Sequence, residues 1–97
     1  METIKLAKEI TYDGEKVTQI NLDFDALTGK DLLAAEKELK VQNTGAISSP
    51  VKEFDKEYLA IVGAKAVGMP TDFIYLLGAK DFTKLTLLVQ GFLMGEE

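Results

Sequence analysis

The sequence contains neither cysteine nor histidine. Without cysteine the chain can form no disulfide bond and has no thiol chemistry. Without histidine it lacks the most common general base of enzymes and the most common side-chain ligand of transition metals. These two absences argue against most forms of nucleophilic, acid–base and metal-assisted catalysis.

Excess positive charge and long apolar runs are also missing. The formal net charge is -5, whereas non-specific binding to nucleic acid or to an anionic membrane surface requires a basic footprint. No run approaches the 18 apolar residues of a membrane-spanning helix. Residues 1–10 lack the apolar core of a signal peptide, so we do not expect secretion. Neither nucleic acid nor membrane is an expected partner.

What is present is the composition of an ordinary globular domain. The 97 residues are 46% apolar and 28% charged, and this length predicts one domain over residues 1–97. We expect an α+β fold, with an N-terminal β-hairpin over residues 1–24 followed by about four α-helices in a small helical bundle.

Two segments near the N-terminus alternate between apolar and polar residues, which indicates β-strands. The apolar positions are Ile4, Leu6, Ile10, Tyr12, Ile20, Leu22 and Phe24. Asp13 and Gly14 lie between the two segments and predict a turn.

The loop length fixes the strand register, and two lengths fit this turn. A two-residue loop would pair Ala7 with Ile20 and would separate the apolar residues of the two strands. A three-residue loop, Tyr12 to Gly14, would pair Leu6 with Ile20 and bring them together. We prefer the three-residue loop.

A helix is predicted over residues 28–41, with Thr28 as its N-cap and Asp31 in the first turn. Residues 42–54 are rich in turn formers and predict a loop.

The remaining segment, residues 55–94, is predicted to be helical, with Asp55 as the first cap. Gly68 and Pro70 should end its first helix. Gly63 within that helix is small enough to let another helix approach closely. Three short helices should therefore pack together after the loop.

The last helix lies within residues 76–94, the longest apolar segment of the chain. At helical spacing one stripe contains Phe82, Leu85, Val89 and Phe92, with Leu88 beside it. We expect Phe82 and Leu85 to be core residues.

The same helix has more apolar residues than one buried stripe needs. Leu87, Leu93 and Met94 widen the stripe beyond one face, and a domain of this size has little protein with which to bury them all. Methionine also adapts well to varied contacts. These three residues are the predicted protein-binding surface, and the same surface would allow homo-oligomers.

No arrangement of residues predicts catalysis or metal binding. Asp23, Asp25 and Asp31 superficially suggest a calcium-binding loop, but that loop needs an oxygen ligand at its fifth position, glycine at its sixth and an acid at its twelfth. Counted from Asp23, these positions hold Leu27, Thr28 and Ala34. Ser48 and Ser49 have no histidine to activate them. We expect no catalytic residues, no cofactor and no metal ion.

Three segments together resemble a known family. They are LTGKDLLAAEKEL at Leu27 to Leu39, EYLAIVGAKAVGMP at Glu57 to Pro70, and AKDFTKLTLLVQGFL at Ala79 to Leu93. Their order and spacing, after a short N-terminal strand segment, are similar to those of the tail assembly chaperones of long-tailed bacteriophages. The resemblance covers nearly the whole chain.

The resemblance implies a non-enzymatic function in the cytoplasm of the infected bacterium. Such chaperones bind the tape measure protein, keep its apolar helices soluble, help to recruit tail tube subunits, and are absent from the mature virion. In many of these phages a ribosomal frameshift yields a longer product that shares this domain. The alternative is a structural tail or connector component of a phage or prophage particle.

Overall fold

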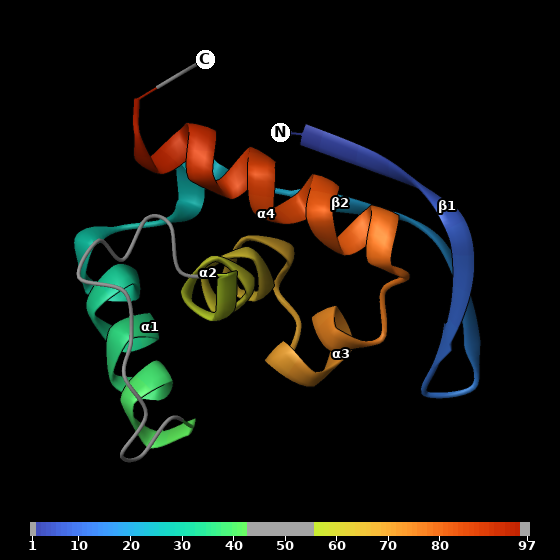
Figure 1. Ribbon diagram of the computed structural model, residues 1–97, viewed down its shortest axis with the longest axis horizontal. Coiled ribbons are helices and arrows are strands. Elements are labelled where there is room, and N and C mark those ends of the chain that lie inside the picture. The colour runs from blue at the N-terminus through green and yellow to red at the C-terminus, as the bar shows by residue number, and fades with distance from the viewer. Residues whose placement is uncertain (1, 43–55, 96–97) are drawn as a thin grey trace.

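The computed structural model describes residues 2–42 and 56–95 and contains, in that part of the chain, a two-stranded sheet followed by four α-helices (Figure 1). The elements are β1 (Glu2–Tyr12), β2 (Glu15–Leu22), a 3₁₀ turn η1 (Phe24–Ala26), α1 (Gly29–Gln42), α2 (Lys56–Val67), α3 (Thr71–Tyr75) and α4 (Ala79–Leu93). The predicted hairpin followed by four helices is confirmed. Gln42 ends α1, and the rest of the predicted loop over 42–54, with Asp55, lies outside the described residues.

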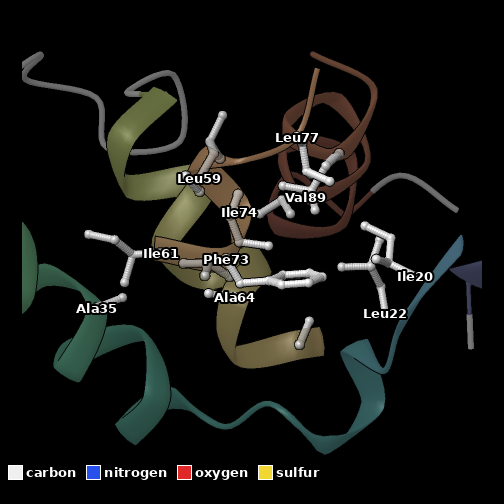
Figure 2. Close-up of a cluster of buried hydrophobic side chains, with 14 of the residues drawn as sticks. Ile20, Leu22, Ala35, Leu59, Ile61, Ala64, Phe73, Ile74, Leu77 and Val89 are labelled. Carbon is white, nitrogen blue, oxygen red and sulfur yellow. The ribbon is translucent and has the colours of Figure 1, made fainter. Parts of the chain in front are cut away.

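Helix α2 occupies the middle of the fold. It contacts α1, α3, α4 and β2, so nearly its whole circumference is covered. Figure 2 shows side chains from these elements converging on it, among them Ala35, Ile20, Leu22, Phe73, Ile74 and Val89. The small residues of α2 let its neighbours come close, which explains how so short a helix can be surrounded.

Helix α4 comes close to α2 at Gly63. A β-carbon on Gly63 would lie 2.7 Å from Cδ2 of Leu85 and 3.4 Å from Cγ2 of Val89. Leu85 and Val89 are both fully buried. The predicted close approach at Gly63 is confirmed, and the absence of a side chain there sets the distance between the two helices.

The predicted start of α1 and the predicted stop of α2 are also confirmed. The Thr28 backbone N–H donates to Asp31 Oδ2 at 2.9 Å, and the Asp31 N–H donates to Thr28 Oγ1 at 3.4 Å, which is a capping box. Gly68 follows α2 with φ of +83°, a left-handed conformation that favours glycine.

The preferred hairpin register is wrong. Ile10 pairs with Val17 and Tyr12 pairs with Glu15, so the loop has two residues, Asp13 and Gly14. Both loop residues have positive φ, 55° and 82°, as a type I′ turn requires. The three-residue loop and its pairing of Leu6 with Ile20 are therefore excluded.

The two-residue register does not continue along the hairpin, because β1 contains a bulge. β1 has four residues between Lys5 and Ile10, whereas β2 has one between the partners of these residues. Beyond the bulge Ile4 pairs with Ile20, and both are buried. Both sequence-based registers assumed an unbroken ladder, and the bulge is what realigns the apolar residues. β2 also ends at Leu22, so Phe24 belongs to η1.

The bulge is held by a side chain from the other end of the sequence. The Asp81 carboxylate, in the first turn of α4, accepts the backbone N–H of Ala7 at 2.9 Å and that of Lys8 at 3.2 Å. Asp81 is only 3% exposed. These two hydrogen bonds replace ladder bonds that the bulge removes, and they fasten β1 to the start of α4.

The buried face of α4 differs in part from the predicted stripe. Leu85 and Val89 are fully buried as expected, but Phe82 is only partly buried and packs against the edge of the core. Phe92 is also partly buried and stacks on Phe24, with ring centroids 4.7 Å apart. Phe82 is not a core residue because Asp81, and not Phe82, occupies the buried side of the first turn of α4.

The Gly63–Leu85 contact yields a prediction for stability. Leu85→Ala should lower the free energy of unfolding by about 2–5 kcal/mol, as for other buried leucines. Gly63→Ala should destabilise the native protein. In the Leu85→Ala background the same change should be less destabilising, or even stabilising, because the space next to Gly63 is then open. The coupling free energy between the two substitutions should be roughly 0.5–3 kcal/mol. Urea denaturation gives the free energy of unfolding of the two single variants and of the double variant. Gly29→Ala is the control, since nothing lies within 4 Å of that site; equal effects of Gly63→Ala in both backgrounds would contradict the packing.

A second prediction concerns Asp81. Asp81→Ala leaves two backbone N–H groups of the bulge without their acceptor, which should cost about 1–3 kcal/mol. Asp81→Asn keeps one acceptor oxygen, so it should lower the free energy of unfolding by less than Asp81→Ala does. Hydrogen exchange at the Ala7 and Lys8 amides should accelerate more than exchange at Ile4, which pairs within the ladder. Unchanged exchange at Ala7 and Lys8 in Asp81→Ala would show that the carboxylate does not hold the bulge.

Candidate functional site: the outer face of α4

The predicted binding residues divide into an exposed pair and one half-buried residue. The side chains of Leu87 and Met94 are 59% and 51% exposed. Leu87 lies in α4 and Met94 is its C-cap, seven residues or about two helical turns further on, so both lie on the same side of the helix. Leu93 is half-buried and packs against the core. The structure thus brings Leu87 and Met94 together and places Leu93 at the border of their face.

The opposite face of α4 is fully used in folding. Leu85 and Val89 pack on α2, and Leu88 is partly buried beside them. Figure 1 shows α4 along the upper part of the molecule, with α2 and α3 below it. Leu87 and Met94 therefore make no contribution to the core that would explain their apolar character.

The outer face of α4 also carries two exposed lysines that the sequence-based reasoning missed. Lys80 and Lys84 form one row with Leu87, Gly91 and Met94, in which successive residues are four or three apart. This is the spacing at which one helix packs along another. The spacing is visible in the sequence, but a reading that follows only apolar residues does not find it.

The charge of this face differs in sign from that of the whole chain. The acidic residue of α4, Asp81, is buried and bonded to the bulge of β1. Lys80 and Lys84 consequently face solvent without an acidic residue of their own helix beside them. The outer face of α4 is a basic and apolar surface on a chain of net charge -5.

A different exposed apolar pair lies at the end of α3, where Tyr75 is the last residue and Leu76 the C-cap, and has acidic surroundings. Burial raises the pKa of the Tyr75 phenol, and nearby carboxylates raise it further, those of Glu57, Glu38 and Asp72. Tyr75 and Leu76 are each about half exposed. This second surface is opposite in charge to the outer face of α4, so the two would not suit the same ligand.

Across residues 2–42 and 56–95 no three acidic side chains come together in a way that could hold a metal ion. Within the described chain no helix has both the length and the apolar character needed to cross a bilayer.

The sequence as a whole matches one protein family. The family model described as "Phage tail assembly chaperone proteins, E, or 41 or 14" matches residues 3–94, from β1 through the last residue of the exposed pair on α4. Neither a curated protein nor a solved structure gives a significant match. Since the match spans the hairpin and every described helix, the chain belongs to the phage tail assembly chaperone family.

Proposed function

We propose that this protein is a non-enzymatic chaperone that binds the tape measure protein during tail assembly and assists assembly of the tail tube. Family membership supports a role in phage tail assembly. The observation that carries the finer proposal is the exposure of Leu87 and Met94 on one face of a helix whose other face is buried. The binding surface is centred on these two residues, with Leu93 at its border.

Hydrophobic burial provides the energy for this binding. Complete burial of a fully exposed leucine or methionine side chain contributes about 1.5–3 kcal/mol. Leu87 and Met94 are 59% and 51% exposed, so covering each of them contributes roughly half of that. Two such side chains must also offset the entropy lost on association, so a single site of this size binds weakly and reversibly. Weak, reversible binding suits a protein that must leave its client when the tail is complete.

The acidic remainder of the chain keeps the complex in solution. A net charge of -5 opposes association between complexes. The protein would therefore act in the cytoplasm of the bacterial host, covering apolar helices of the tape measure protein before tube subunits surround them.

The same surface would pair two copies of the chain when no client is present, because an exposed apolar patch favours self-association. In that case light scattering of the purified protein should show a dimer or larger species that the double substitution Leu87→Asp and Met94→Asp converts to a monomer.

The rival reading is a structural tail or connector component. A chaperone leaves the particle, whereas a structural component stays in it. Mass spectrometry of purified particles should find no copies of this protein; stoichiometric recovery with the tail proteins would establish the structural role instead.

The test of binding is co-expression with the tape measure protein of the same phage. The double substitution Leu87→Asp and Met94→Asp should leave the circular dichroism spectrum unchanged, because both side chains face solvent, and should abolish co-purification. The soluble yield of the tape measure protein should also fall when it is co-expressed with the double variant. Leu93 is left unchanged in this test because it packs against the core.

A matched control is available on α1. Leu33 is 62% exposed, as much as Leu87, but lies on another helix. Leu33→Asp should therefore retain binding. If the double variant on α4 folds and still solubilises its partner, the binding surface lies elsewhere on the chain.

A further inference from the structure

We infer that the outer face of α4 selects a helix whose apolar stripe is flanked by acidic residues. This inference rests on the proposed function, since it names the chemistry of the client segment that the same face would bind. The observation behind it is the row Lys80, Lys84, Leu87, Gly91 and Met94, which joins a basic half to an apolar half.

The spacing of the row specifies a helix as the occupant. Residues four and three apart follow a single line along α4, as the contact residues of paired helices do. The line from Lys80 to Met94 is about 21 Å long at 1.5 Å per residue. This length equals that of two heptads in a partner helix. Gly91 lies between Leu87 and Met94 and is half-buried, so the apolar side chains of the row are those of Leu87 and Met94.

Lys80 and Lys84 favour acidic residues on the partner helix. Neither Lys80 nor Lys84 forms an ion pair with any residue that the structure describes; the exposed ion pair seen there joins Lys16 to Glu9. Lys80 lies in the first turn of α4, where the helix dipole disfavours a positive charge, and Lys84 follows one turn later. Carboxylates of a partner would relieve this repulsion and gain two ion pairs.

The bulge of β1 adds a third lysine beside the same end of α4. The Cβ and Cδ atoms of Lys8 lie 3.5 and 3.6 Å from the point that a β-carbon on Gly78 would occupy, so the Lys8 stem crosses the residue that precedes α4. Asp81 fixes this position by accepting the Lys8 N–H. A residue remote in sequence thus packs against the start of α4, although these contacts are on the side of Gly78 and Asp81 and not in the row of Lys80 and Lys84.

Direct tests use two synthetic helical peptides of about three heptads. Both carry the same leucine stripe, but the flanking positions are glutamate in one and lysine in the other. The net charge of the whole chain, -5, favours the lysine peptide at long range. The face of α4 favours the glutamate peptide, so the two effects predict opposite preferences.

We expect the glutamate peptide to bind roughly tenfold more tightly, measured by fluorescence anisotropy at physiological salt. The double substitution Lys80→Glu and Lys84→Glu should abolish or reverse this preference. The matched control is Lys37→Glu with Lys40→Glu, which makes the same change of net charge at exposed positions on α1 and should preserve the preference. Tighter binding of the lysine peptide, or equal binding of the two, would overturn the inference.

Co-purification with the tape measure protein separates this inference from the proposed function. If Leu87→Asp with Met94→Asp abolishes binding while Lys80→Glu with Lys84→Glu does not, the function stands and the charge selection is wrong. If both double variants lose the client and the α1 control keeps it, both proposals are supported. Retention by the Leu87 and Met94 variant overturns the proposed function itself.

Discussion

The burial of α2 on nearly all sides is the constraint on which the rest of the structure depends. A twelve-residue helix can be enclosed by three helices and a strand only if its own side chains are small where its neighbours come closest. Gly63 meets this condition against Leu85 and Val89 of α4. Since α4 can pack on α2 with one face alone, the enclosure also decides which residues of α4 remain in contact with solvent.

A single carboxylate connects this helical core to the hairpin. Asp81 satisfies two backbone N–H groups of the β1 bulge, and the bulge in turn lets Ile4 lie opposite Ile20. A two-stranded sheet is only marginally stable alone, so its attachment to α4 matters to the whole hairpin. The same bond removes the negative charge of α4 from the surface. The outer face of the helix is basic because its one acid is used in folding.

Folding uses one face of α4, and the proposed function would use the other. Its inner face encloses α2, and its outer face carries Leu87 and Met94 beside lysines that no described residue neutralises. Under the proposed function the protein has to cover apolar segments of its client without losing its own fold. Exposed side chains on a helix whose opposite face is buried would meet both requirements, because a partner could then bind and leave without disturbing the core.

The sequence by itself determined the elements and the family. Alternation, the Asp13–Gly14 turn, the Thr28–Asp31 capping box and the Gly68 stop are local signals, and local interactions decide them. It also indicated that Leu87 and Met94 exceed what the core of α4 can bury. Tertiary structure alone decided the strand register, because the bulge depends on hydrogen bonds from Asp81, more than seventy residues away. It likewise decided that Phe82 and Leu93 lie at borders of the core and that the Lys8 side chain packs beside Gly78, since these outcomes depend on which neighbours occupy the space around each residue.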